Sequence, residues 1–258
     1  MTVQQIYDII QEVAPFETQA EFDNSGLLIG DPNQDVTDVL FALDVTDAVL
    51  DEAESTGVQL IVTHHPLMFT PRSRITEEDT EGRLIRRLIR LNISLISAHT
   101  NLDQAPDGIN DTLAALCGLR RETVTGDGYF RTGLLPEPMN AAQYAEFLSE
   151  NLHTVVRVMG PKDVLILSVG LCSGSGSSEY SRAIEEGCSA FVTGEMKHDK
   201  ALLLADHGIV TFECGHAATE TPGICALAEA LQNALNQVEY GVRVYQSAVP
   251  AYAFSMYD

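Results

Sequence analysis

The sequence has 258 residues, 45% of them hydrophobic, and a formal net charge of −22. A chain of this length can bury a substantial core in one or two domains. No apolar run approaches the ~20 residues that a membrane-spanning helix requires. The negative charge repels a phosphate backbone and argues against direct binding to nucleic acid.

Four arginines, Arg83, Arg86, Arg87 and Arg90, are the best candidate for a basic patch. They are better explained as basic residues in the last turns of a helix with an acidic first turn, which the helix dipole favours. The 5 cysteines are odd in number and lack a Cys-x-x-Cys pair, and the N-terminus shows no signal-peptide pattern. We therefore predict a cytoplasmic protein without a disulfide framework.

In chain order, the first half of the sequence alternates between helix and strand patterns. Apolar strands are expected over residues 39–43, 58–62 and 93–96, and helices over residues 3–13, 47–55, 79–90 and 108–117. Such alternation predicts a parallel sheet with helices on its faces.

A second alternating block follows. Helices are expected over residues 141–151, 178–186, 197–206 and 217–236, and strands over residues 154–158, 164–171, 190–193, 209–212 and 242–245. Glycine and proline in residues 121–138 predict a boundary between the blocks.

The predicted fold class is therefore α/β, with two α/β lobes built on mostly parallel sheets flanked by helices. We expect residues 1–125 to form the first lobe and residues 126–208 the second. Residues 209–258 are expected to return to the first lobe and complete its functional site.

Metal-ligand side chains follow three of the predicted strands, where open α/β sheets bind their ligands. These side chains are His64, His65, Asp103, His216 and Glu220. The i, i+4 spacing of His216 and Glu220 places both on one face of a helix. Each motif alone has a plainer explanation, because such a pair also occurs on surface helices and an aspartate often caps a helix. The three motifs together favour a metal site.

Three imidazoles and two carboxylates form a mixed donor set that suits zinc, iron(II) or manganese. Five ligands exceed the four of a structural tetrahedral site and are too few to fill two metal ions. The sequence therefore predicts an open metal site of the catalytic type.

Two further residues are candidates for catalysis. His99, in the segment that ends at Asp103, could transfer a proton, or it could be a buried histidine bonded to backbone. Glu195 follows a predicted strand and could face the site, although a helix start explains it equally well. The glycine- and serine-rich residues 172–178 could cradle a phosphate or form only a tight turn, since they lack a Walker lysine.

Several motifs appear in an order that resembles a known family. They include Asp23-Asn24-Ser25-Gly26, Thr63-His64-His65-Pro66, Ser97-Ala98-His99-Thr100, Thr193-Gly194-Glu195 and Gly215-His216-Ala217-Ala218. The sequence resembles the NIF-three-like family, whose members are also called GTP cyclohydrolase I type 2 homologues. Phe22 departs from the family pattern, which usually has tryptophan there.

The resemblance implies a centre of two divalent metal ions per chain, zinc, iron or manganese. It implies that Glu220 bridges the ions, that His65 and Asp103 bind one and that His64 and His216 bind the other. It also implies a toroidal homohexamer.

Two functions remain in competition. The first is a dimetal hydrolase of a small-molecule substrate, acting on a guanine ring as a GTP cyclohydrolase does, on a phosphoester or on an amide. The alternative is a non-catalytic metal-binding scaffold, carrier or regulatory protein. Neither predicts contact with nucleic acid or a membrane.

Overall fold

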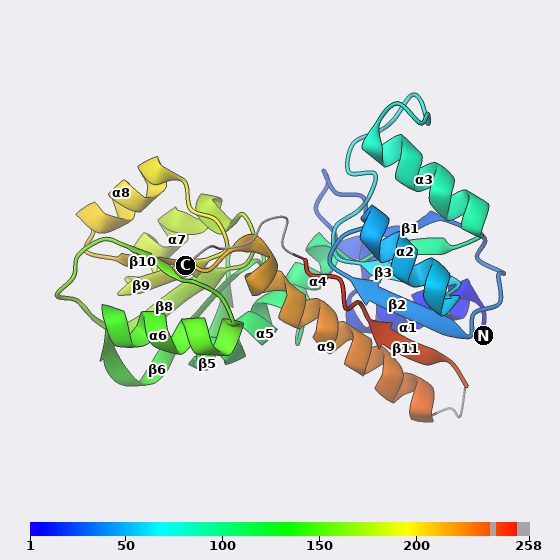
Figure 1. Ribbon diagram of the computed structural model, residues 1–258. Coiled ribbons are helices and arrows are strands. Elements are labelled where there is room, and N and C mark those ends of the chain that lie inside the picture. Colours follow the sequence, from blue (N-terminus) through cyan, green and yellow to red (C-terminus); the bar gives the residue numbers. More distant parts are fainter. Residues whose placement is uncertain (238–240, 252–258) are drawn as a thin grey trace. The chain divides into compact units, whose positions relative to one another are not determined.

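The computed structural model describes residues 1–237 and 241–251, and its chain forms two compact units (Figure 1). Unit 1 comprises Met1–Pro106 and the chain from Ile224 onward, and unit 2 comprises Asp107–Gly223. The limits expected from the sequence lay at residues 125 and 208, whereas the second limit in the structure falls inside helix α9 (His216–Gln237). Among the described residues, no helix has both the length and the apolar character of a membrane span.

Unit 1 contains a five-stranded sheet in the order β1-β4-β3-β2-β11. The strands are β1 (Gly26–Ile29), β2 (Asp38–Ala42), β3 (Leu60–Thr63), β4 (Ser94–Ser97) and β11 (Arg243–Gln246). All neighbouring strands are parallel except β1, which is antiparallel to β4. Helix α1 (Val3–Val13) begins the unit, and the short helices η1 (Phe16–Thr18) and α4 (Thr100–Gln104) also belong to it.

Helices α2 (Asp47–Thr56) and α3 (Thr80–Leu91) pack on the sheet of unit 1. Their buried side chains Val49, Leu50 and Leu84 share a core with the strand residues Leu40 and Ile61. Burial of such side chains is the main stabilising contribution to the unit.

Local signals in the sequence set the helix ends of unit 1. The Thr2 hydroxyl accepts a hydrogen bond from the Gln5 amide in a capping box at the start of α1. At the start of α2, the Thr46 hydroxyl accepts from the Val49 amide. Gly57 ends α2 with a φ of 71°, a conformation that favours glycine.

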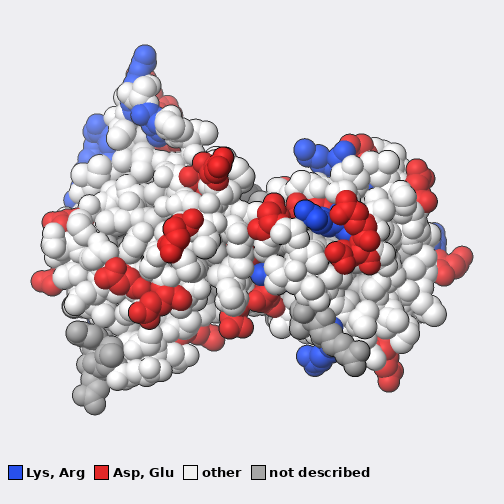
Figure 2. Space-filling model, turned by 180° about the vertical axis from the view of Figure 1, so that it is seen from behind, with Lys and Arg blue, Asp and Glu red and all other residues white. Residues whose placement is uncertain are grey.

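The arginines of α3 form ion pairs with acidic side chains. Arg83 and Arg87 pair with carboxylates of α2, and Arg86 and Arg90 share Glu77. Figure 2 shows the molecule from behind. The blue side chains of unit 1 gather at the top of its left-hand part, the region where Figure 1 shows α3. The candidate basic patch is therefore compensated locally.

Unit 2 contains a mixed six-stranded sheet in the order β5-β6-β8-β9-β10-β7. The parallel core consists of β8 (Leu165–Cys172), β9 (Ala190–Thr193) and β10 (Val210–Glu213). Antiparallel strands flank it: β5 (Arg120–Thr125) and β6 (Phe130–Asn140) on one side and β7 (Arg157–Met159) on the other. This sheet is mixed rather than mostly parallel.

Helices cover both faces of the unit 2 sheet. α5 (Ile109–Leu116) and α6 (Ala141–Leu152) share one buried cluster with the strands. α7 (Tyr180–Glu185) and α8 (His198–Asp206) share another, and the short helix η2 (Gly176–Glu179) precedes α7. The two sheets and their helices confirm the predicted α/β class.

The boundary predicted at residues 121–138 is wrong, because these residues belong to the β5–β6 hairpin inside the unit 2 sheet. Gly126 and Gly128 form its turn with φ values of 71° and 97°. Pro136 and Pro138 lie where the pairing of β6 with β8 shifts register, between Leu134 and Met139. The glycines and prolines therefore mark a turn and a bulge.

Candidate metal centre

In unit 1, three histidines leave the sheet at one edge. β3 and β4 are parallel and end in register, with Thr63 opposite Ser97, so the residues that follow them emerge together. Ring centroids lie 5.0 Å apart for His64 and His65, 5.0 Å for His64 and His99, and 5.6 Å for His65 and His99. One ring nitrogen of each lies within 4.8 Å of the others, so this group could hold a metal ion.

Asp103 joins this group from α4. Its Oδ1 atom lies 3.6 Å from His64 Nε2. The helix begins after His99, which occupies the N-cap position, so Asp103 is an internal residue of α4 and not its cap. The structure thus brings together the three unit 1 residues that the sequence predicted as ligands.

Hydrogen bonds at Nδ1 orient the two adjacent histidines. His64 Nδ1 lies 2.8 Å from the carbonyl oxygen of Ala98, and His65 Nδ1 lies 2.8 Å from Asp44 Oδ1. A carbonyl oxygen only accepts, so His64 carries its proton on Nδ1, and Nε2 is the nitrogen with which it could bind a metal ion.

Asp44 was missed by sequence reasoning, which followed only the strand ends that carry histidine. It stands just beyond β2, which pairs with β3. The available signal was an acidic residue at the carboxyl end of an adjacent parallel strand.

His99 is held by a buried carboxylate. Its Nδ1 atom lies 2.8 Å from Asp23 Oδ1, and Asp23 Oδ2 accepts from the Thr100 amide at 3.0 Å and from the Ser25 hydroxyl at 3.0 Å. Burial raises the pKa of Asp23, but the hydrogen bonds from His99 and Thr100 outweigh it and hold this pKa far below its usual range. Asp23 is therefore an ionised group that fixes the orientation of His99.

In unit 2, the end of β10 leads directly into α9 and its two predicted ligands. His216 Nε2 lies 3.1 Å from Glu220 Oε2, as the i, i+4 spacing predicts, and Glu220 is only 4% exposed. Glu195 Oε1 lies 3.3 Å from His216 Nδ1, and Glu195 Oε2 accepts from the Ser175 hydroxyl at 2.6 Å. Glu195 thus lies beside a predicted metal ligand.

The glycine- and serine-rich loop packs against the same pair. A Cβ atom at Gly174 would lie 2.1 Å from Glu220 Oε1 and 3.2 Å from His216 Nε2. The Gly174 amide donates to Thr219 Oγ1 at 3.0 Å. Only glycine allows the loop to approach the carboxylate this closely.

Cys214 is not suited to binding a metal as a thiolate. It is buried, and this burial together with the charge of Glu213 raises the pKa of its thiol to about 12. The donors in unit 2 are therefore imidazole nitrogen and carboxylate oxygen, a set that fits a divalent transition metal.

Comparison with known proteins places these residues in a family. A model of the Duf34/NIF3 (NGG1p interacting factor 3) family matches residues 1–251. A GTP cyclohydrolase 1 type 2 homolog of Clostridium perfringens is 31% identical over 244 residues, with 92% of this chain and 93% of that protein covered. A protein of Helicobacter pylori named GTP cyclohydrolase 1 type 2 is 28% identical over 235 residues, which cover 90% of this chain and 92% of that one.

A solved structure supports the same relationship. Staphylococcus aureus protein SA1388 matches with a TM-score of 0.92 and 27% identity, covering 100% of this chain and 99% of that chain. The resemblance seen in the sequence motifs is thereby confirmed. This chain belongs to the Duf34/NIF3 family.

Proposed function

We propose that this protein binds two divalent metal ions and is a metal-dependent hydrolase of a small-molecule substrate. The proposed ligands are His64, His65 and Asp103 of unit 1 and His216 and Glu220 of unit 2. The family resemblance implies that Glu220 would be the bridging carboxylate. Zinc, iron(II) and manganese all suit this donor set.

One observation carries the proposal: the Nδ1 atom of each proposed histidine ligand faces an acceptor. Ala98 O serves His64, Asp44 serves His65 and Glu195 serves His216. Metal-bound histidines almost always have this arrangement, which fixes the ring and presents Nε2 to the ion. Surface histidines have no need of it.

The chain's own residues would supply the remaining parts of a hydrolytic site. A pair of divalent ions held by these ligands would supply Lewis-acid chemistry, polarising the group under attack and lowering the pKa of water. Asp23 keeps His99 in one orientation, so His99 is our candidate for moving a proton at its Nε2 atom. Glu195 positions His216 and lies beside the metal ligands, which makes it the second catalytic candidate.

The reaction class comes from the names of relatives and from the donor set. The name of the Helicobacter pylori relative makes guanine ring opening in a nucleotide the first reaction to test. Phosphoester and amide hydrolysis are the next, because dinuclear centres serve both. A cytoplasmic location and a homohexameric state stay predictions, as does the absence of direct nucleic acid binding.

The test is a screen of purified, metal-reconstituted protein against nucleotides, phosphoesters and peptides. The proposal expects turnover of at least one class by the wild type and its loss in Glu220→Ala, with circular dichroism confirming that the variant is folded. Two bound metal ions without turnover of any class would instead support the non-catalytic scaffold, carrier or regulatory protein.

A further inference from the structure

Unit 2 contains a cavity of about 680 Å³ beside the glycine- and serine-rich loop. It is lined by Ser175, Ser177, Ser178, Glu195, Met196, Lys197 and Lys200. Its volume is in the range of sites that bind small molecules and cofactors. None of these residues except Glu195 has a part in the proposed metal centre.

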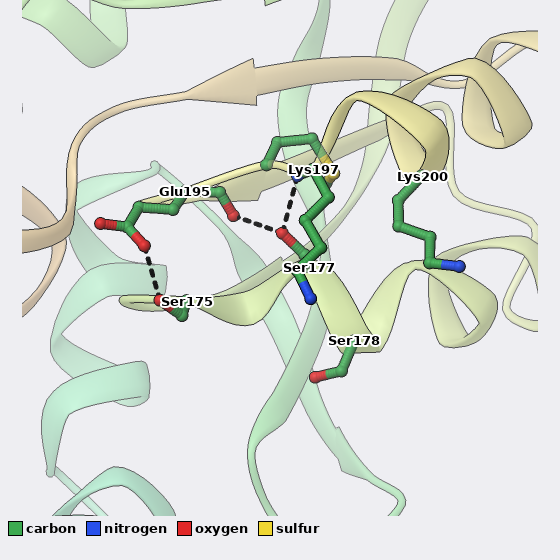
Figure 3. A pocket seen from close by; sticks show the side chains of 7 residues that line it. Ser175, Ser177, Ser178, Glu195, Lys197 and Lys200 are labelled. Atoms are coloured by element: carbon green, nitrogen blue, oxygen red, sulfur yellow. Dashed lines mark hydrogen bonds between the residues drawn. The ribbon is translucent and has the colours of Figure 1, made fainter.

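The cavity has an acidic end and a basic end. Figure 3 shows the Glu195 carboxylate on one side, bonded to Ser175, and the ammonium groups of Lys197 and Lys200 on the side of Ser178. The acidic end adjoins the proposed metal ligands, because Glu195 Oε1 lies 3.3 Å from His216 Nδ1.

Ser177 fixes the backbone between these ends. Its hydroxyl donates to the carbonyl oxygen of Glu195 at 2.7 Å and accepts from the Lys197 amide at 2.9 Å. The position of Lys197 next to the loop is therefore set by specific hydrogen bonds.

The basic end is unusual for this chain. The sequence contains only three lysines, Lys162, Lys197 and Lys200, against 37 acidic residues, and two of the three line this cavity. The Lys200 ammonium pairs with the Asp199 carboxylate, with Nζ 3.1 Å from Oδ2, and lies 4.7 Å from the centroid of the Tyr180 ring. The Lys197 ammonium pairs with no carboxylate among the residues the structure describes. This cavity therefore carries a local positive charge in a protein whose net charge is strongly negative.

We propose that this cavity binds the phosphoryl group of the substrate. Lys197 and Lys200 would contact the phosphoryl oxygens, and Ser178, whose hydroxyl makes only a 3.5 Å contact with Glu179, would donate a hydrogen bond. The rest of the molecule would extend past Glu195 toward His216. This inference rests on the proposed function, since it names the substrate class of the same site.

Pyrophosphate is the minimal probe, and calorimetric titration of the full-length, chelator-treated protein measures its binding without metal–phosphate complexes. We expect Lys197→Gln to weaken pyrophosphate binding about tenfold, the usual effect of losing a charge-assisted contact. Lys200→Gln should weaken pyrophosphate binding less, because the ion pair with Asp199 already offsets part of the Lys200 charge. The matched control is Lys162→Gln, which removes the same charge from the loop between β7 and β8 and should leave binding unchanged.

A second titration distinguishes a phosphorylated substrate from a free anion. GTP should bind at least as tightly as pyrophosphate, guanosine should bind more weakly than GTP, and Lys197→Gln should reduce that difference. Pyrophosphate binding without GTP binding would overturn the substrate assignment. Absence of binding to the wild type, or equal weakening by Lys197→Gln and Lys162→Gln, would overturn the site itself.

Metal content measured on the same preparations separates the two proposals. Both lysine variants should keep the metal content of the wild type. If the wild type bound no metal but showed Lys197-dependent pyrophosphate binding, the dimetal proposal would fail and the anion site would stand. If the wild type bound metal fully but did not bind pyrophosphate, the anion site would fail and the dimetal proposal would stand.

Discussion

The Nδ1 atom of His65 lies 2.8 Å from the Oδ1 atom of Asp44, at the carboxyl end of the neighbouring strand. This contact fixes the ring of a proposed metal ligand, although Asp44 is not itself among the proposed ligands. Partners of this kind are a large part of how proteins hold metal ions.

Replacing Asp44 should therefore weaken metal binding without unfolding the protein. We expect Asp44→Ala to reduce zinc affinity by roughly 10- to 100-fold in a titration against a competing chelator. Asp51→Ala is the control, because Asp51 is an exposed helix residue whose ion pair is with Arg87. Equal affinities in the two variants would contradict the orienting role of Asp44.

Gly174→Ala should displace Glu220 from its position beside His216. The new methyl group would lie 2.1 Å from Glu220 Oε1, so the carboxylate must move and metal content should fall. Gly187→Ala is a matched control, since Gly187 has a similar φ of 63° with no atom within 4 Å of the added Cβ. In both variants, an alanine in the left-handed conformation should lower the free energy of unfolding by about 1–2 kcal/mol. Only Gly174→Ala should also lose metal. Wild-type metal content in Gly174→Ala would refute this explanation.

The ion pair between Asp38 and Arg243 should make stability depend on pH. Arg243 Nε lies 2.7 Å from Asp38 Oδ1, and the two residues are register partners of β2 and β11. Burial raises the pKa of Asp38, but hydrogen bonds from Arg243, Thr37 and Tyr245 outweigh it and leave the pKa below its usual value. Ionised Asp38 therefore stabilises the folded state above the unfolded pKa of about 3.9, and this stabilisation is lost as pH falls through the lower folded pKa.

Asp38→Asn should accordingly reduce the free energy of unfolding at pH 7 by about 1 kcal/mol or less, because the Arg243 side chain is largely exposed and solvent screens the ion pair. The difference from the wild type should shrink below about pH 4. Urea denaturation of the metal-free proteins over this pH range measures it. A difference that is constant with pH would show that the charge of Asp38 has no part in the effect.

A hexamer of this chain must overcome electrostatic repulsion, because each copy carries a formal net charge of −22. Sedimentation at moderate salt should show the hexamer, and low salt should favour dissociation because repulsion is screened less. A monomer of about 28 kDa at all micromolar concentrations would exclude the ring.

Much of the fold could be predicted from the sequence because its signals are local. Apolar strand runs and caps such as Thr2 and Thr46 depend on near neighbours in the chain. The β5–β6 hairpin could not be recognised, because Gly126 and Pro136 are equally typical of a linker. Only pairing with β8, distant in sequence, identifies the segment as part of a sheet.

The candidate site shows the same limit. The histidines were found because they stand at strand ends, and the i, i+4 pair was found from helical spacing. Asp44 became visible only when the pairing of β2 with β3 placed it beside His65. The closeness of Gly174 to Glu220 likewise depends on packing between a loop and a helix far apart in the sequence.

Counting metal ions shows directly whether this chain holds a dinuclear centre. Elemental analysis of protein reconstituted with excess Mn²⁺, Zn²⁺ or Fe²⁺ and then desalted should give about two ions per chain, as a dinuclear centre requires. Glu220→Ala should hold far less, and less than His99→Ala, because a bridging ligand serves both ions. A ratio near zero in natively folded wild type would contradict the dinuclear centre, and equal metal content in the two variants would contradict the bridging role of Glu220.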